Sequence, residues 1–364
     1  MSAPHKDRIA CFISPHGYGH AARAAAVMEA LYHLDPGKAF EIFTTVPEWF
    51  FRNSLSASFS YHPLLTDIGL FQETALKADL AETLARLDSF LPFHRDKIYE
   101  LAHFVLERRC RLVLCDISAM GILVARHAGI PSVLIENFTW DWLYEEYTAE
   151  CPRLGAHRFY LGELFGAADF HIQTQPVCCP TRVHLTTSPV SRKPKTSREE
   201  TRKRLEIHPD AFVAMITMGG IPEDYLFRDE LLKYRDVVFL IPGARQERIK
   251  TENLILFPHH SELFHPDLVN ASDALIGKVG YSTLSEAYWA GIPFGYIARR
   301  DFRESPMMIS FIEKNMRGFA VAENEFTCGA FASRLPELFA LGRISRSGTN
   351  GADQAARFIT ALIV

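Results

Sequence analysis

The segment formed by residues 276–304 constrains the fold of this chain more than any other. It begins with an apolar run, turns at Gly280, continues as a helix-forming stretch, turns again at Gly291-Ile-Pro293 and ends in a second apolar run. This order predicts a strand, a helix and a second strand. A glycine turn that leads into a helix leaves backbone amides at the helix start, where a diphosphate binds well.

The side chains around this turn suit a nucleotide sugar. Ser282 and Thr283 add hydroxyl groups at the helix start, and Lys278 adds positive charge beside them. Glu286 follows Ser282 by about one helical turn, so its carboxylate can accept hydrogen bonds from ribose hydroxyls. The alternative is structural: Ser282 caps a helix, and Glu286 is a solvated acid of the first turn.

Short apolar runs alternate with helix-forming segments along both halves of the chain. In the first half we expect strands at 9–14, 40–46, 111–115 and 132–136, and helices at 21–34 and 118–128. In the second half we expect strands at 211–217, 237–241, 254–257, 274–276 and 294–298. The alternation predicts two α/β domains, each with parallel strands and helical crossovers.

A change of composition marks the division between the domains. Residues 186–200 are rich in Ser, Thr, Pro and charge, which is typical of a linker. We therefore expect an N-terminal domain over 1–185 and a C-terminal domain over 201–349. A final helix at 350–364 has an apolar face and is expected to pack back on the first domain. The stretch 66–110 is expected to be helical, with core-forming Leu and Phe residues.

Composition and charge exclude several classes of protein. The chain of 364 residues is 48% hydrophobic and 23% charged, as in soluble globular proteins. Its net charge of -4 gives no basic stripe for nucleic acid. The first residues lack the pattern of a signal peptide, and no run approaches the roughly 18 apolar residues of a membrane span. The seven cysteines lie mostly in apolar surroundings, which predicts reduced thiols in a cytoplasmic protein.

The sequence offers no recognisable metal or cofactor motif. Cys178-Cys179 lacks the two-residue gap of a redox or zinc site. The dispersed histidines offer no clear His-x-x-x-His helix, and no Asp-x-Asp pair is present to hold a divalent ion against a diphosphate. We therefore expect chemistry without a metal and without a bound cofactor.

A second group of candidate residues follows the first predicted strand, in His16-Gly17-Tyr-Gly19-His20. Ligands of parallel sheets bind at this edge, and two glycines permit close approach of a substrate. The positive end of the following helix disfavours imidazolium, so His20 can serve as a base. His16, Gly17 and Gly19 are expected to contact an acceptor.

The same glycines raise an alternative. Gly17, Gly19 and Ala22 also match the Gly-x-Gly-x-x-Ala pattern of dinucleotide-binding proteins. However, Glu41 stands near the start of the next strand, whereas an acid at its end is needed to hold the ribose of NAD. The second strand therefore argues against NAD.

Two further strand ends carry polar and aromatic groups. Asp116 ends a strand of the same sheet, so it is expected near His20, where it would orient the imidazole; the alternative is a helix cap. Glu136 and Trp140 follow the next strand, and carboxylates mixed with aromatics suit binding of a sugar acceptor. Trp140 is equally compatible with a core anchor.

These motifs together resemble the glycosyltransferases of the GT-B fold, over essentially the whole chain. Gly280-Tyr-Ser-Thr-Leu-Ser-Glu286, followed by Gly291-Ile-Pro293, is similar to the donor signature of plant secondary-product glycosyltransferases and of the GlcNAc transferase of cell-wall synthesis. The resemblance implies two Rossmann-like α/β domains that face each other across a cleft. It also implies that the C-terminal domain binds the donor, with the ribose at Glu286.

The resemblance implies roles for other positions as well. Gly19-His20 falls where plant-type transferases have their catalytic base, and Asp116 falls at the acid that orients it. Lys278 replaces a histidine of the plant enzymes and keeps its positive charge. Asp301 falls where family members have acidic or amide groups for the donor sugar.

Two stretches, 137–147 and 277–286, resemble the glycosyltransferase-like N-terminal domain of plant L-arabinokinases, and so does 300–304. The kinase half has no counterpart in this sequence, and no Gly-x-x-x-x-Gly-Lys-Ser/Thr loop is present. We therefore expect no ATP-dependent phosphorylation of a sugar.

The predicted function is a metal-independent, inverting transfer of a sugar from a nucleotide sugar to an acceptor hydroxyl. UDP is the usual nucleotide of the family. Gly219, after the first strand of the second domain, is a further candidate for the diphosphate, unless it only forms a tight turn. Two alternatives remain: an epimerase that uses Asp116, Glu136 and His16 as acid-base groups, and a non-catalytic sensor of nucleotide sugars.

Overall fold

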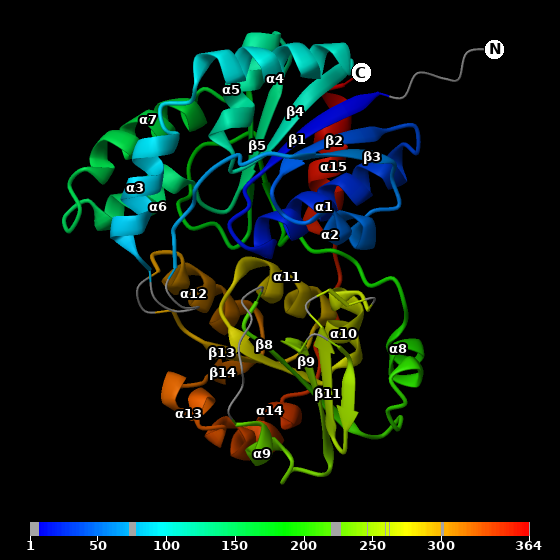
Figure 1. The fold of residues 1–364 in the computed structure, drawn as a ribbon. Coiled ribbons are helices and arrows are strands. Elements are labelled where there is room, and N and C mark those ends of the chain that lie inside the picture. The colour runs from blue at the N-terminus through cyan, green and yellow to red at the C-terminus, as the bar shows by residue number, and fades with distance from the viewer. Residues whose placement is uncertain are drawn as a thin grey trace. The chain divides into compact units, whose positions relative to one another are not determined.

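The computed structural model describes residues 7–72, 78–219, 227–245, 247–258, 260–261, 263–299 and 302–363. The chain divides into two compact units (Figure 1). The N-terminal unit comprises Met1–Ser191 and Thr349–Val364, and the C-terminal unit comprises Arg192–Gly348. Each unit contains a seven-stranded sheet with helices, as the alternation of apolar runs predicts.

The sheet of the N-terminal unit has the order β3-β2-β1-β4-β5-β6-β7, with all neighbours parallel. Its strands are β1 (Arg8–Ile13), β2 (Ala39–Thr44), β3 (Phe59–Pro63), β4 (Cys110–Asp116), β5 (Ser132–Glu136), β6 (Phe170–Thr174) and β7 (Leu185–Thr187). Its helices are α1 (Tyr18–Leu34), α2 (Glu48–Ser54), α3 (Leu80–Phe90), α4 (Arg95–Glu107), α5 (Ala119–Ala128), α6 (Trp140–Tyr147), α7 (Leu154–Gly166) and α15 (Gly351–Ala361). The strand order reverses between β1 and β4, and parallel sheets bind ligands at the carboxyl ends of such a pair.

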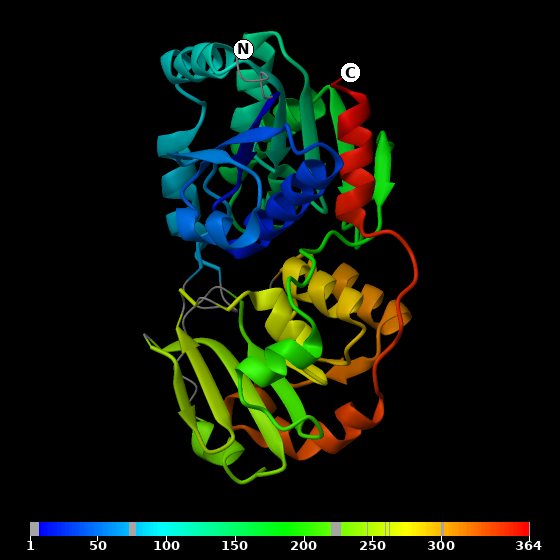
Figure 2. The same ribbon diagram turned by 90° about the vertical axis from the view of Figure 1, so that its right-hand side faces the viewer.

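The C-terminal helix α15 packs against α1 and β7 (Figure 2). Gly351 makes this approach possible, because a Cβ atom there would lie 2.0 Å from the carbonyl oxygen of Ser188. Alanines on both helices are fully buried, among them Ala24, Ala25 and Ala355. Small side chains therefore allow the last helix to join the first unit.

The segment predicted as a linker, 186–200, is partly ordered into secondary structure. Its first residues belong to β7, and its last residues begin α8 (Arg198–Arg204). The side chain of Ser197 caps α8 by accepting a hydrogen bond from the backbone N–H of Glu200. The division between the units falls between Ser191 and Arg192. Serine and charged residues mark linkers, but they also favour helix starts, and here the second role applies to part of the segment.

The sheet of the C-terminal unit has the order β10-β11-β9-β8-β12-β13-β14 and is parallel except for β10, which runs antiparallel to β11. Its strands are β8 (Phe212–Thr217), β9 (Val237–Arg245), β10 (Ile249–Thr251), β11 (Leu254–Pro258), β12 (Ala274–Lys278), β13 (Phe294–Ile297) and β14 (Gly318–Ala320). The helices after α8 are α9 (Arg228–Leu231), α10 (His265–Ala271), α11 (Tyr281–Ala290), α12 (Ser305–Asn315), α13 (Glu323–Thr327) and α14 (Leu335–Ala340), with a 3-10 turn at Ala330–Arg334. β8 and β12 are neighbours at the reversal of strand order, so their carboxyl ends form the expected ligand edge.

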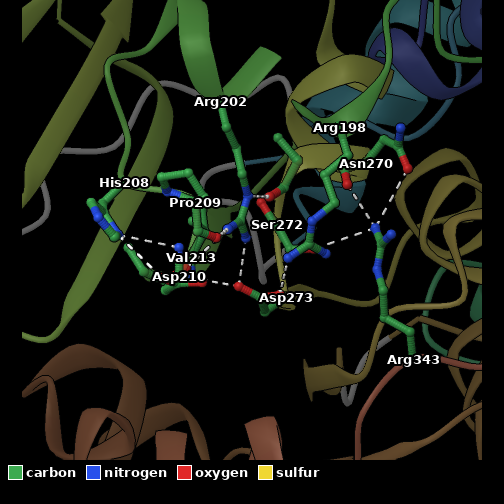
Figure 3. Close-up of polar contacts among 12 residues, drawn as sticks. Arg198, Arg202, His208, Pro209, Asp210, Val213, Asn270, Ser272, Asp273 and Arg343 are labelled. Carbon is green, nitrogen blue, oxygen red and sulfur yellow. Dashed lines mark hydrogen bonds and ion pairs between the residues drawn. The ribbon is translucent and has the colours of Figure 1, made fainter. Parts of the chain in front are cut away.

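A network of hydrogen bonds between charged and polar groups lies at the amino ends of β8 and β12, opposite the expected ligand edge (Figure 3). Asp273, just before β12, accepts hydrogen bonds from Arg198 Nη2 at 2.5 Å and from Arg202 Nη2 at 2.7 Å. It also accepts one from the backbone N–H of Val213 at 2.8 Å. Arg343 Nη2 donates to the carbonyl oxygen of Asn270 at 2.6 Å. This network anchors α8 to the sheet on the edge away from the candidate donor residues.

Candidate functional site

The start of α1 brings His20 to the carboxyl edge of the first sheet. Gly17 is the residue before the helix and has a φ of +70°, a backbone conformation that glycine adopts without strain. The chain then enters α1 at Tyr18, which places Gly19 and His20 in its first turn. His20 is 7% exposed, so its imidazole is largely enclosed by the fold.

Asp116 lies directly against His20, as the sequence predicts for two strand ends at one edge. His20 Nδ1 is 3.0 Å from Asp116 Oδ1, and the Asp116 side chain is fully buried. Ser118, not Asp116, occupies the position before α5. The alternative role of Asp116 as a helix cap is therefore wrong.

Arg23, which the sequence analysis did not select, completes this cluster. Its Nε and Nη2 donate to the two carboxylate oxygens of Asp116 at 2.8 and 2.6 Å, and its Nη1 donates to Asn137 Oδ1 at 2.5 Å. The side chain is 1% exposed. The sequence signal that could have identified Arg23 is its position as a single arginine among the alanines of α1. An arginine buried with these alanines needs an acidic or polar partner, which indicates a charged cluster.

The charges around Asp116 determine its protonation. Burial alone would raise the pKa of the Asp116 carboxyl, but Arg23 and His20 outweigh it and hold this pKa below its ordinary value. The carboxylate is therefore ionised and can accept a hydrogen bond from Nδ1–H of His20. When Nδ1 carries the proton of a neutral imidazole, Nε2 is the nitrogen that can act as a general base.

The structure brings Trp140 and His16 to the same region, but Trp140 is 1% exposed. Its ring lies edge-on to His16 at 5.1 Å between centroids and is 6.0 Å from the ring of His20. Its indole Nε1–H donates to Asp67 Oδ2 at 3.3 Å. Trp140 therefore supports the two histidines from within the core, the alternative that the sequence left open.

Asp67 is a second residue that the sequence analysis missed. It lies after β3, where it accepts hydrogen bonds from Ser14 Oγ at 3.0 Å and from Trp140. Burial is the largest cause that raises the pKa of Asp67, and the charge of Asp116 raises it as well, whereas the two hydrogen bonds lower it in part. The net result is a pKa of about 7. No local pattern around Asp67 marks it, since its partners are distant in sequence.

Replacing Asp67 with asparagine is expected to make the protein more stable at pH 8. The pKa of this carboxyl is raised from 3.8 to about 7, so the folded state loses stability as pH rises between these values. Three pKa units correspond to roughly 4 kcal/mol of unfolding free energy, as an upper bound. Urea unfolding of both proteins at pH 5 and pH 8 checks this. Equal differences at the two pH values would contradict a raised pKa of Asp67.

Glu136 is not part of the cluster around His20. Asp116 pairs with Ile135 across β4 and β5, so the next residue, Glu136, points to the other face of the sheet. There Glu136 Oε1 accepts hydrogen bonds from His171 Nε2 at 2.7 Å and Gln173 Nε2 at 2.9 Å. The structure therefore separates this predicted acceptor-binding carboxylate from the predicted base.

The predicted donor residues lie at the carboxyl ends of β8 and β12 in the C-terminal unit. Gly219 has a φ of +78°, and a Cβ atom there would lie 3.1 Å from Lys278 Cε, so these two residues are adjacent. Gly280 precedes α11 and has no side chain to cap it; Ser282 and Thr283 lie in the first turn. This is an uncapped helix start beside a lysine, which suits an anion. The predicted donor residue Asp301 lies outside the described residues.

Glu286 is buried in α11 and carries two partners that the sequence analysis did not identify. Arg192 Nε and Nη2 donate to Glu286 Oε1 at 3.1 and 2.9 Å, and His265 Nδ1 is 2.7 Å from Oε2. Burial raises the pKa of Glu286, but Arg192 and His265 outweigh burial and lower it below its ordinary value. Glu286 is 4% exposed, so it is not a solvated acid.

Two classes of feature are absent from the part of the chain that the structure describes. In these ranges no three His, Cys, Asp or Glu side chains gather in a way that would hold a metal ion. None of the described helices is both long enough and apolar enough to cross a membrane.

The strand orders and the two α/β units agree with the solved structures that resemble this chain. The chain has the GT-B fold, which is also the fold of the glycosyltransferases among those structures. L-arabinokinase of Arabidopsis thaliana is 28% identical to it over 370 residues, which are 99% of this chain and 35% of the relative. The chain therefore spans about a third of the length of this curated relative. No family model matches the sequence.

Solved structures support the fold over the whole chain. A UDP-glucosyltransferase from Polygonum tinctorium that glucosylates indoxyl is 14% identical, with a TM-score of 0.60 over 100% of this chain and 99% of that one. The glycosyltransferase of kitacinnamycin is 14% identical, with a TM-score of 0.59 over 99% and 95%. MurG of Acinetobacter baumannii is 14% identical, with a TM-score of 0.53 over 98% and 99%. At these identities the likeness concerns the fold.

Proposed function

We propose that this protein transfers a sugar from a nucleotide-sugar donor to an acceptor hydroxyl. The observation that carries the proposal is the buried contact of 3.0 Å between His20 and Asp116 at the carboxyl edge of the first sheet. The GT-B fold and the uncapped start of α11 beside Lys278 support it from the side of the donor. A histidine held by an acid is an arrangement suited to proton removal from a hydroxyl.

In the proposed reaction, Nε2 of His20 removes the proton of the acceptor hydroxyl. The acceptor oxygen forms a bond to the anomeric carbon, while the bond from that carbon to the diphosphate oxygen breaks on the opposite side. The configuration of the anomeric carbon is therefore inverted. Asp116 accepts a hydrogen bond from Nδ1 and stabilises the imidazolium that forms.

The C-terminal unit supplies the stabilisation of the leaving group in this proposal. The amides at the start of α11, with Ser282 and Thr283, face negative charge that develops on the diphosphate, and Lys278 neutralises part of it. These groups take the place that a divalent cation has in other transferases. UDP is the proposed nucleotide.

The epimerase alternative receives less support from the geometry. It requires several acid-base groups around one sugar, and Asp116, Glu136 and His16 were the candidates. Because Glu136 points to the face of the sheet opposite Asp116, these two carboxylates do not converge on one ligand. Transfer, which needs only the His20–Asp116 pair, is the simpler account.

The anomeric configuration of the product tests the proposed reaction. The protein is incubated with a UDP-sugar of α configuration and a panel of acceptors in EDTA, and the products are followed by proton NMR. We expect a β-linked product and an unchanged rate in EDTA. Retention of configuration, or loss of activity that a divalent cation restores, would contradict the proposed chemistry.

A further inference from the structure

The carboxylate of Glu286, the proposed ribose-binding group, already takes part in hydrogen bonds within the protein. Its Oε1 receives two N–H groups of Arg192, and its Oε2 lies 2.7 Å from His265 Nδ1. A carboxylate oxygen offers two lone pairs, so Oε1 has none left and Oε2 has one. With 4% of Glu286 exposed, its carboxylate is covered in this state.

A ribose with two hydroxyls needs both oxygens of the carboxylate. In this structure only one lone pair of the Glu286 carboxylate is left to accept a hydrogen bond from the ribose. If both ribose hydroxyls are to donate to Glu286, Arg192 or His265 has to give up its hydrogen bond. Arg192 contributes two of the three hydrogen bonds and is 9% exposed on its side chain. Its guanidinium also lies 5.0 Å from the centre of the Phe264 ring, a cation–π contact that helps to hold the guanidinium beside Glu286.

We propose that Arg192 is a latch on Glu286 that the diphosphate of a bound nucleotide releases. The inference rests on the proposed function, because it concerns the same donor site. In the closed state the guanidinium pairs with Glu286. In the nucleotide-bound state it pairs with the diphosphate, and the ribose hydroxyls donate to Glu286 in its place.

In this exchange Arg192 keeps an anionic partner, because the diphosphate replaces the carboxylate of Glu286. A guanidinium binds phosphate as well as it binds carboxylate, in both cases through its fork of N–H groups. Ser282, at the proposed diphosphate site, lies four residues before Glu286, about 6 Å along the axis of α11. That distance is within the length of an arginine side chain. A nucleoside without phosphate offers no new partner, so it has to break the Arg192–Glu286 pair without compensation.

The latch therefore predicts how the protein discriminates between UDP and uridine. Calorimetric dissociation constants for both are measured with the wild type and with Arg192→Met, which keeps length but removes charge. We expect uridine to bind about tenfold more tightly to Arg192→Met than to the wild type, whereas UDP should bind no more tightly. The ratio of the dissociation constant of uridine to that of UDP should therefore fall by at least about tenfold. Lys195→Met is the control, because Lys195 Nζ lies 4.9 Å from the same ring of Phe264. It removes an equal charge and should leave the preference unchanged.

Other results would overturn the latch. If Arg192→Met weakens UDP and uridine by the same factor, Arg192 only supports Glu286, and the latch is wrong while the proposed function stands. If neither protein binds UDP, both the latch and the proposed donor site are wrong. Should Arg192→Met fold poorly, Arg192→Lys serves instead, because lysine keeps the positive charge but lacks the paired N–H groups of a guanidinium. In this variant the preference for UDP over uridine should decrease, but by less than in Arg192→Met. An unchanged preference in Arg192→Lys would also count against the latch.

Discussion

Replacing His20 with alanine is expected to reduce turnover by about 10²- to 10⁴-fold, the usual contribution of a general base. The affinity for the nucleotide sugar should not change, because the residues assigned to the donor belong to the C-terminal unit. Turnover is measured as release of the nucleoside diphosphate, and affinity by calorimetry. His33→Ala is the matched control: this histidine is in the same helix but 64% exposed, and its loss should leave the rate unchanged.

The result for His20 also separates transfer from sensing. A variant that keeps the wild-type rate would exclude His20 as the base. A wild type that binds nucleotide sugars but releases no nucleoside diphosphate, and whose cellular function survives His20→Ala, would favour the non-catalytic sensor. In that case the buried His20–Asp116 pair would only support the fold.

Replacing Arg23 with methionine is expected to lower the free energy of unfolding by about 3–5 kcal/mol, as is usual when one partner of a buried ion pair is removed. Asp116 is fully buried, and Arg23 donates to both of its oxygens. Without Arg23 the carboxylate retains His20 as a partner but loses its permanent cation. Urea unfolding at pH 7 measures the change.

An exposed arginine provides the control for this second prediction. Arg52 pairs with Glu48 but is 68% exposed, so Arg52→Met should cost about 0–1 kcal/mol. The pH dependence adds a check of sign. Because the pKa of Asp116 is below 3.8 in the folded wild type, its contribution to stability is present above pH 3.8 and is lost as pH falls through the folded pKa. In Arg23→Met this loss should begin at higher pH; identical acid unfolding in both proteins would contradict the assigned pairing.

Much of the fold follows from local patterns in the sequence. Short apolar runs bounded by glycine, proline or charge predicted the central strands β1, β4, β5, β8 and β12. The short strands at or near the sheet edges, β3, β7, β10 and β14, were not predicted, because they are partly exposed and lack continuous apolar runs. Sequence spacing indicates a buried strand more clearly than an edge strand.

The candidate site was predictable where one strand end or one helix start carries the relevant residue. His20 follows from its position at the start of α1 and Asp116 from its position at the end of β4, and parallel topology brings them together. Arg23, Asp67 and Arg192 did not follow, because their roles depend on partners far along the chain. Asp67, for example, meets Ser14 and Trp140, which are 53 and 73 residues away. Such contacts become visible only once the strands are placed.

Thermal unfolding with a panel of ligands is the measurement we would use to test whether the C-terminal unit binds a nucleotide sugar without a metal. The panel contains UDP-, GDP-, dTDP- and ADP-sugars and NAD, each with and without EDTA. A ligand at about a hundred times its dissociation constant adds about 2.7 kcal/mol, a shift of several degrees. We expect UDP-sugars to raise the unfolding temperature equally with and without EDTA, and we expect this shift to be lost in Glu286→Ala. No shift with any nucleotide sugar, or a shift with NAD alone, would contradict this expectation.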